Sequence, residues 1–354
     1  MIRHEKALQK LHEGTVIPAN PLALDENRQF DEQRQRAVVR YYLDAGVGGL
    51  AVAVHTTQFE IRAPKHNLLE KVLNVAKEEA TKFEEKTGET IVMVAGACGP
   101  KEQAVQEAEL AKSLGYDAVL LSPGGLNHLS EDEMVERTKA VAEVMPVIGF
   151  YLQTAVGGRV FSYNYWERIC AIDNVVAIKA APFNRYYSLD VVRAAALSKR
   201  ADKITLYTGN DDNIVLDLIS SYKFTVNGKT YEKGFIGGLL GHWSVWTKKA
   251  VELFEKCKAV RGMDSIPYEM MTLANEVTDT NAVFFDTANG FKGCIAGLHE
   301  VLRRQGIFKG TWCLNPDEQM SEGQLEEIDR IYKAYPHLND DAFVKENLDK
   351  WLAD

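Results

Sequence analysis

A single lysine stands within an apolar run near the middle of the chain, at residues 175–181. The run reads Val-Val-Ala-Ile-Lys-Ala-Ala, which has the length and composition of a buried parallel strand that is apolar on both faces. A lysine there is costly unless it lies at the strand end and faces a cavity. Loss of hydration then disfavours the ammonium form, lowers the pKa and leaves an amine that can attack a carbonyl carbon. Lys179 is therefore a candidate nucleophile; the alternative is a lysine that reaches solvent or pairs with a carboxylate.

Other predicted strands also end at, or are followed by, residues that could contribute to a site. These residues are His55, Thr56, Thr57, Tyr151, Thr208, Gly209, Asn210, Asp211, Gly241 and His242. Imine chemistry needs a lysine to attack a ketone, and it needs groups that move protons while water leaves. A tyrosine on the neighbouring strand can relay those protons, and threonines with their loop amides can hold a carboxylate. The residue types therefore favour Lys179 as nucleophile, Tyr151 as proton relay, and Thr56 with Thr57 as the carboxylate site.

The elements that must position these residues alternate regularly along the chain. Apolar runs predict strands at 15–19, 49–54, 90–97, 117–121, 146–151, 175–181, 203–207 and 235–240. Helical spacing fills the intervals, at 31–44, 67–86, 101–113, 131–144, 164–172, 188–198, 213–221 and 244–260. Eight such units in about 250 residues predict an α/β fold, a (β/α)8 TIM barrel spanning residues 1–262. A doubly wound sheet would favour a glycine-rich turn after the first strand, and the sequence TVIPANPLAL has none.

Two segments depart from this alternation. Residues 223–233 carry an Asn227-Gly228 turn between alternating residues, which predicts a β-hairpin. It precedes the eighth strand, so we expect it at the barrel bottom, away from the site, in a structural or interfacial role. Residues 263–354 predict a helical C-terminal extension, with helices at 268–276, 281–288, 294–305, 322–335 and 340–352.

Composition limits the classes of function. The 354 residues carry a net charge of −9 without long blocks, which argues against a nucleic-acid surface. No apolar run is long enough to cross a bilayer, and the start of the chain is too polar for a signal peptide. The five cysteines are scattered and include no CxxC pair, so neither a disulfide framework nor a zinc site is expected. These features predict a cytoplasmic protein with no membrane partner.

The segments that carry a family resemblance, over roughly residues 12–260, are GTVIPANPLALDENRQFDEQ, GGLAVAVHTTQFE, PVIGFY, VVAIKAA and TGNDD. Taken together, these segments resemble the dihydrodipicolinate synthase / N-acetylneuraminate lyase family of class I aldolases, and they stand in the family's order. The resemblance implies that Lys179 forms an imine with a 2-oxo acid such as pyruvate. It implies that Tyr151 relays protons and acts as acid and base at the carbon–carbon bond. Thr56 and Thr57 would supply hydroxyl and amide donors to the carboxylate.

Further substrate-binding candidates follow from the same resemblance, and they are His55, Asn210, Asp211, Gly238 and Arg159. His55 stands where the family has glycine, and it is either a substrate contact or a histidine of the barrel rim. Arg159 is a candidate for a distal carboxylate in a shifted register, or else a surface arginine. The segment 122–125, Ser-Pro-Gly-Gly, lacks the aromatic residue that synthase members lend to a neighbouring subunit. These departures argue against the lysine-biosynthetic substrate and leave the imine chemistry in place.

The sequence therefore predicts a class I lyase or aldolase that acts on pyruvate or a related 2-oxo acid. One alternative is a hydratase or dehydratase of a keto-deoxy sugar acid by the same imine. Another is a non-catalytic 2-oxo acid binding protein on the same scaffold. A metal-dependent aldolase is disfavoured, because His55, His242 and Asp211 are dispersed in type and spacing. No cofactor or metal is expected, since the lysine serves as electron sink, and the family resemblance implies a homo-oligomer, a dimer or tetramer.

Overall fold

The computed structural model describes residues 2–353. Within that range, eight parallel strands pair in the order β1-β10-β7-β6-β5-β4-β3-β2. Their bounds are β1 (Val16–Pro18), β2 (Gly49–Val52), β3 (Val92–Ala97), β4 (Ala118–Leu121), β5 (Val147–Leu152), β6 (Val175–Ala181), β7 (Thr205–Thr208) and β10 (Phe235–Leu240). A parallel bridge between Ala19 and Ala51 joins β1 to β2, and Asn20 N donates to Ala51 O at 2.8 Å. The sheet is thus closed, and the prediction of a TIM barrel is confirmed.

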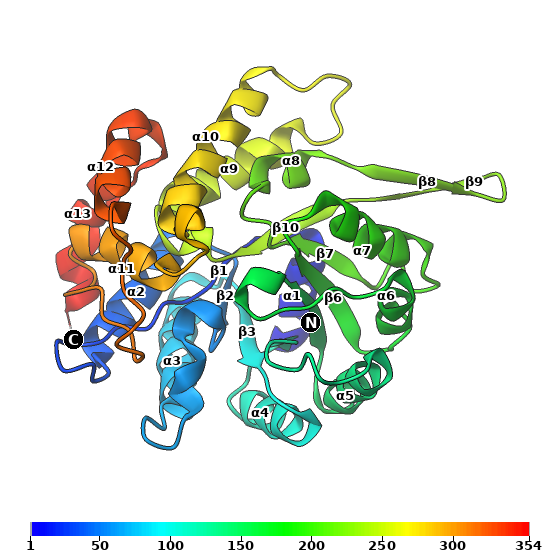
Figure 1. The fold of residues 1–354 in the computed structure, drawn as a ribbon, viewed down its shortest axis with the longest axis horizontal. Coiled ribbons are helices and arrows are strands. Elements are labelled where there is room, and N and C mark those ends of the chain that lie inside the picture. The colour runs from blue at the N-terminus through cyan, green and yellow to red at the C-terminus, as the bar shows by residue number, and fades with distance from the viewer. Residues whose placement is uncertain (1, 354) are drawn as a thin grey trace.

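Helices follow the strands and surround the barrel (Figure 1). They are α2 (Glu32–Ala45), α3 (Leu69–Thr87), α4 (Lys101–Ser113), α5 (Glu131–Val144), α6 (Tyr163–Cys170), α7 (Arg185–Leu197), α8 (Ile214–Ile219) and α9 (Thr247–Val260). Local chemistry sets their ends. Asp31 accepts a hydrogen bond from Arg34 N at 3.1 Å and begins α2, which ends before left-handed Gly46.

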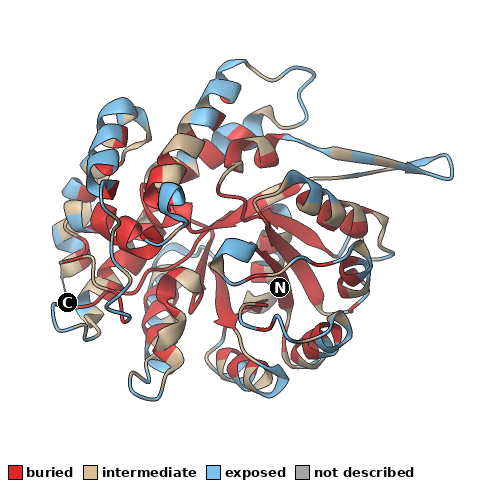
Figure 2. Cartoon of the chain, in the orientation of Figure 1, coloured by how far each residue is buried: buried red, intermediate tan, exposed pale blue. Residues whose placement is uncertain are grey.

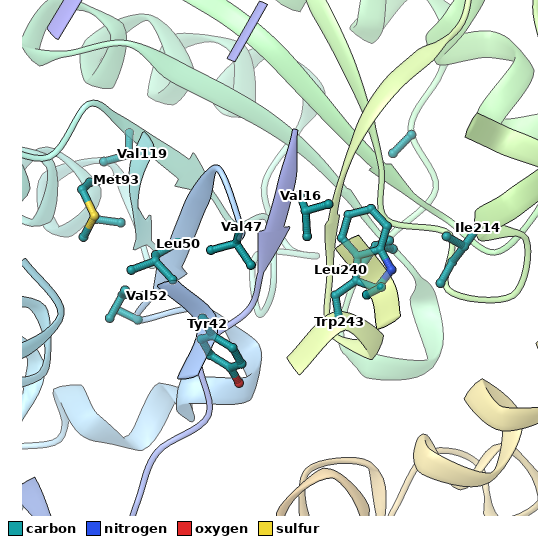
Figure 3. Packing of buried hydrophobic residues seen from close by; sticks show 14 of the residues in the cluster. Val16, Tyr42, Val47, Leu50, Val52, Met93, Val119, Ile214, Leu240 and Trp243 are labelled. Atoms are coloured by element: carbon teal, nitrogen blue, oxygen red, sulfur yellow. The ribbon is translucent and has the colours of Figure 1, made fainter. Parts of the chain in front are cut away.

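Apolar residues form one core layer on each side of the strands (Figure 2). Strand alternation explains the division, because successive side chains point to opposite faces. In β2, Leu50 and Val52 belong to the outer layer beneath the helices, whereas Ala51 belongs to the layer inside the barrel. Figure 3 shows part of the outer layer, where Leu50 and Val52 share the packing with Met93 and Val119.

The N-terminal end of the barrel is covered by helix α1 (Arg3–Glu13). Its buried residues Ala7 and Leu11 join the layer inside the barrel, and the Tyr207 hydroxyl donates to Leu11 O at 2.8 Å. The position of α1 leaves the carboxyl ends of the strands as the end at which a site can open.

The predicted hairpin is present as β8 (Tyr222–Val226) and β9 (Lys229–Lys233), with Asn227 and Gly228 both at positive φ. It extends outward past α7 in Figure 1. At its base, Lys233 Nζ donates to Ala201 O at 2.6 Å, ahead of the start of β7. The hairpin therefore leaves the barrel at its N-terminal end, as predicted.

The C-terminal extension is helical, as predicted, and comprises α10 (Glu269–Phe284), α11 (Cys294–Arg304), α12 (Gln324–Ala334) and α13 (Asp341–Leu352). The prediction of separate helices at 268–276 and 281–288 is wrong, because α10 runs through the intervening residues. No glycine or proline interrupts that stretch, and Val277 and Thr280 are buried within it. The domain boundary at residue 262 stays a prediction. Across residues 2–353, no helix has the length and apolarity needed to cross a membrane.

Candidate active site

A cavity opens at the carboxyl ends of the barrel strands. The lining residues from the barrel are Ala19, Val54, His55, Thr56, Leu120, Phe150, Leu152, Gln153, Val156, Lys179, Ala181, Phe183, Gly209, Asp211 and Gly241. Phe285, Phe291 and Cys294 of the C-terminal extension complete the wall. Seven strands or the loops that follow them thus converge on one space, the position at which barrel enzymes carry out chemistry.

Lys179 lies near the end of β6 and is only 8% exposed. Its Nζ atom lies 4.5 Å from the centre of the Phe150 ring, and among residues 2–353 no carboxylate oxygen forms an ion pair with it within 4.0 Å. Burial lowers the pKa of Lys179 to about 8, and the charge of Asp211 opposes that shift. About a tenth of the amine is therefore un-ionised at pH 7, far more than for an ordinary lysine, and the neutral form is the one that a nucleophile requires.

Glycine at position 209 makes room for this lysine. A Cβ atom there would lie 2.5 Å from Lys179 Cε and 2.8 Å from Ala181 Cβ, distances at which atoms overlap. Gly209 N donates to Ala180 O at 2.8 Å, which continues the β6–β7 pairing to the cavity. The strand end after β7 therefore fixes the path of the Lys179 side chain.

Asp211 is the carboxylate that faces the same cavity, and it is 5% exposed. Its Oδ1 atom accepts a hydrogen bond from His242 N at 2.9 Å. Burial raises the pKa of Asp211 to about 7, although the charge of Lys179 and the His242 hydrogen bond act in the opposite direction. Asp211 can thus hold or release a proton near neutral pH, as a general acid or base must.

His55 and Thr56 line the cavity from the short helical turn η1 (His55–Thr57) after β2. Burial, together with the charge of Lys179, lowers the pKa of His55 to about 4, so its imidazole is neutral at pH 7. The Thr56 hydroxyl donates to Asn20 O at 3.2 Å. The placement agrees with the prediction that these two residues face the substrate site; their contact with a substrate stays a prediction.

Tyr151 does not lie beside the Lys179 amine, and that part of the prediction is wrong. In the β5–β6 pairing Phe150 stands opposite Lys179, and Tyr151 stands opposite Ala180. Tyr151 consequently faces the outer core, where its ring lies 5.1 Å from Trp166 and its hydroxyl accepts from Phe161 N at 3.3 Å. Burial raises the pKa of Tyr151 to about 12, so the phenol holds its proton at neutral pH and is poorly suited to relay protons.

A β-bulge explains this outcome. Val147 pairs with Val175, but Ile148 pairs with Ala177, so Val176 has no counterpart. Without that extra residue the register would place Lys179 opposite Tyr151, and both side chains would face the outer core. The bulge turns Lys179 inward, because the consecutive residues Val176 and Ala177 both belong to the inner layer, while Phe150 faces inward by the regular alternation of β5. A one-residue irregularity of this kind leaves no clear signal in the apolar run 175–181.

Four other predicted substrate contacts lie away from the cavity. Thr57 is fully buried, and its hydroxyl donates to Asn20 O at 2.6 Å. Asn210 is buried behind the wall, where its side chain contacts Asp217 at 2.9 Å and accepts from Phe183 N at 3.1 Å. A Cβ atom on Gly238 would meet the Trp243 ring at 2.5 Å, which places it on the outer face. Arg159 donates to Leu129 O and lies over the Phe161 ring. Of the two alternatives for this residue, the structure favours an arginine outside the site.

Sequence reasoning missed the aromatic residues of the cavity. Phe183 adopts a positive φ of 51° between β6 and α7, a conformation that its sequence context does not indicate. Phe285 and Phe291 come from the C-terminal extension, about one hundred residues after the lysine in the sequence. Alternation along β5 puts Phe150 and Tyr151 on opposite faces, but the apolar run does not indicate which of the two faces lies inward. No group of three or more His, Cys, Asp or Glu residues in 2–353 is placed to hold one metal ion.

Comparison with known proteins identifies the family. The model of the dihydrodipicolinate synthetase family matches residues 13–227. N-acetylneuraminate lyase 2 of Escherichia coli O6:H1 is 24% identical over 322 residues, covering 89% of this chain and 92% of that protein. A 4-hydroxy-tetrahydrodipicolinate synthase of Desulforudis audaxviator is 28% identical over 213 residues, covering 58% of this chain and 66% of that protein.

Solved structures agree with this result at the level of fold. Dihydrodipicolinate synthase from Oceanobacillus iheyensis superposes with a TM-score of 0.74 at 15% identity, covering 95% of this chain and 100% of that chain. N-acetylneuraminate lyase from Fusobacterium nucleatum, complexed with pyruvate, gives a TM-score of 0.67 at 18% identity, covering 92% and 97%. The family model spans more than half of the chain, and the relatives are lyases. The chain therefore belongs to the dihydrodipicolinate synthetase family and is an enzyme of the lyase class.

Proposed function

We propose that the protein is a class I lyase that forms an imine between Lys179 and pyruvate or a related 2-oxo acid. The observation that carries the proposal is the Lys179 amine itself, which is buried in the cavity at the strand ends and has a pKa lowered to about 8. An amine with these properties can attack a ketone at neutral pH. The family's lyases provide the precedent for carbon–carbon bond chemistry.

Asp211 is the group that best supports proton transfer in this cavity, since Tyr151 faces outward. Attack by the amine gives a carbinolamine, whose hydroxyl must take up a proton before it leaves as water. Asp211 supplies that proton and then accepts one from the carbon next to the imine, which leaves the enamine. In this mechanism the Thr56 hydroxyl donates to the carboxylate of the 2-oxo acid, in place of its bond to Asn20 O.

A dehydratase that uses the same imine is the second candidate function. The raised pKa of Asp211, about 7, leaves part of this residue protonated at neutral pH. A protonated carboxyl group beside the imine can convert a departing hydroxide into water. A probable 5-dehydro-4-deoxyglucarate dehydratase of Pseudarthrobacter chlorophenolicus is 29% identical over 119 residues, covering 34% of this chain and 36% of that protein.

Trapping with borohydride tests the proposal. The protein is reduced in the presence of pyruvate, digested, and analysed by mass spectrometry. We expect the mass of one reduced pyruvate adduct on the peptide that contains Lys179, and no adduct in Lys179→Arg. Lys139→Arg is the matched control, because the Lys139 side chain is 52% exposed and pairs with Glu136 on the surface of α5.

The outcomes separate the alternatives. An unmodified Lys179 peptide at saturating pyruvate contradicts imine formation. Trapping followed by release of an aldehyde from a 4-hydroxy-2-oxo acid supports the aldolase, whereas loss of water without carbon–carbon cleavage supports the dehydratase. Trapping without either reaction across the substrate panel indicates a 2-oxo acid binding protein.

A further inference from the structure

The wall of the cavity is apolar over most of its extent beyond Lys179. Aliphatic side chains from β2, β4 and β5 face aromatic rings from β5, the loop after β6 and the C-terminal extension. Two of these rings, Phe183 and Phe291, meet edge to face with their centres 6.0 Å apart. Phe285 packs onto Gly241, where a Cβ atom would lie 2.8 Å from the ring. The extension therefore closes the cavity with aromatic rings and adds no charged group to its lining.

The few polar groups in the lining are accounted for by the first substrate. Lys179 becomes the imine, Thr56 faces the carboxylate and Asp211 moves protons, which leaves His55 and Gln153. His55 is neutral because its pKa is lowered to about 4. Arg159, the arginine predicted to bind a distal carboxylate, lies outside the lining.

Charge balance in the cavity therefore disfavours a second anion. The lining contains no arginine and no lysine other than Lys179, and its one carboxyl group, Asp211, is negative in part at neutral pH. A second carboxylate buried against the apolar wall would be desolvated without a cationic partner, which is strongly unfavourable. A polyhydroxylated chain would also lose hydrogen bonds to water that His55 and Gln153 are too few to replace.

We propose that the carbonyl partner of the 2-oxo acid is an uncharged aldehyde with an aromatic substituent, bound against the wall formed by Phe183, Phe285 and Phe291. This inference rests on the proposed function, since it concerns the second substrate of the same site. Planar rings pack against aromatic side chains in edge-to-face or offset arrangements, and their burial supplies the binding energy. The specificity of the enzyme is thus determined in large part by the C-terminal extension.

The reaction balances without an oxidant or reductant. Carbon 3 of the pyruvate enamine attacks the aldehyde carbon, and its electron pair forms the new carbon–carbon bond. The aldehyde oxygen takes a proton and becomes a hydroxyl group. Water from solvent then hydrolyses the imine, which releases a 4-aryl-4-hydroxy-2-oxobutanoate and restores the Lys179 amine; cleavage is the reverse sequence.

A panel of aldehydes tests the inference with the full-length protein and pyruvate. Benzaldehyde is compared with succinic semialdehyde, which carries a carboxylate, and with glyceraldehyde, which is polyhydroxylated. We expect kcat/KM for benzaldehyde to exceed the other two by roughly tenfold or more. Phe291→Ala should lower kcat/KM for benzaldehyde by roughly tenfold, whereas Tyr268→Ala, at an 82% exposed position of the extension, should leave the preference unchanged.

The results distinguish this inference from the proposed function. Failure of pyruvate to be trapped on Lys179 would remove the proposed function, and the inference with it. Trapping that succeeds while succinic semialdehyde or glyceraldehyde matches or exceeds benzaldehyde overturns the inference alone. Trapping without turnover of any aldehyde overturns it as well.

Discussion

The Lys179 amine loses hydration at the end of β6, and the nearby Asp211 carboxylate offsets only part of that loss. An ordinary lysine has a pKa of about 10.4, whereas burial lowers that of Lys179 to about 8. The shift is a consequence of position, because the side chain passes Gly209 and ends over the Phe150 ring instead of in solvent. The apolar surroundings of Lys179 thus activate its amine by lowering its pKa.

The lowered pKa of Lys179 predicts a pH dependence for imine formation. Only the neutral amine attacks, so the initial rate of pyruvate trapping should rise with pH and level off above about 8. In Asp211→Asn the ammonium form loses a stabilising charge, which should move the midpoint to lower pH. Initial rates measured from about pH 6 to about pH 10 check both results. A rate that climbs steadily through the ordinary lysine range would contradict the lowered pKa.

A second prediction at this scale separates Asp211 from Tyr151. Loss of a general acid or base costs roughly a hundredfold or more in rate, and we expect that loss for Asp211→Asn at its own optimal pH. Tyr151→Phe should change the trapping rate far less, because the phenol faces the outer core. The same substitution should lower the free energy of unfolding by about 1 kcal/mol, since Phe161 N loses its partner. A Tyr151→Phe protein as slow as Asp211→Asn would show that the phenol does take part.

Strand ends and their irregularities decide which side chains reach the cavity. The bulge in β6 turns Lys179 to the inner face, and the absence of a side chain at Gly209 leaves space beside the lysine. Bulges occur next to active sites because they redirect a side chain without breaking the sheet. Here the redirected side chain is Lys179, whose amine comes to lie over the Phe150 ring and not beside the Tyr151 phenol.

Gly209→Ala tests the requirement for that space. The added Cβ atom would lie 2.5 Å from Lys179 Cε, so either the lysine or the β7 end must move. We expect trapping at Lys179 to be largely lost and the free energy of unfolding to fall by about 1–3 kcal/mol. Gly149→Ala in β5 is the control, because its nearest contacts would be ordinary ones at 3.5 Å. Equal trapping in the two variants would contradict the account.

At the scale of the whole molecule, the C-terminal extension is attached to the barrel through buried polar contacts. Tyr41 in α2 donates its hydroxyl to Asp340 at 2.7 Å and accepts from Thr247 N at the start of α9, also at 2.7 Å. Gln305, after α11, donates to the same carboxylate at 2.8 Å. The extension is thereby held over the carboxyl ends of the strands, where it closes the cavity.

Removing the Tyr41 hydroxyl should weaken this attachment. Tyr41→Phe leaves Thr247 N without a partner in a buried site, so we expect the free energy of unfolding to fall by about 1–3 kcal/mol. Tyr268→Phe, at an 82% exposed position, should change it by less than about 0.5 kcal/mol. Urea denaturation followed by tryptophan fluorescence measures both. Indistinguishable midpoints for the two variants would contradict the role of this contact.

The homo-oligomer, a dimer or tetramer, and the cytoplasmic location stay predictions of the sequence. Light scattering during size-exclusion chromatography measures the oligomer directly. The exposed hairpin β8–β9 offers a discriminating variant, because an interfacial role predicts that its deletion lowers the measured mass. A monomer in the unaltered protein would contradict the predicted assembly.

The sequence by itself determined the barrel, its order of elements and the candidate lysine. These predictions rest on local signals, namely periodic apolar runs, polar residues at strand ends and the Asn-Gly turn. Such signals can be recognised without knowledge of distant contacts. Lys179, Asp211, His55 and Thr56 were identified in this way, and all four line the cavity.

Only the tertiary structure decided which neighbours the lysine has. The bulge at Val176 turned Lys179 toward Phe150 and away from Tyr151, and the extension brought Phe285 and Phe291 into the wall. Register depends on the pairing of two strands, and the closing wall depends on packing between segments about one hundred residues apart. Neither is encoded in the spacing of residues along one segment, which is why the nucleophile could be predicted and its surroundings could not.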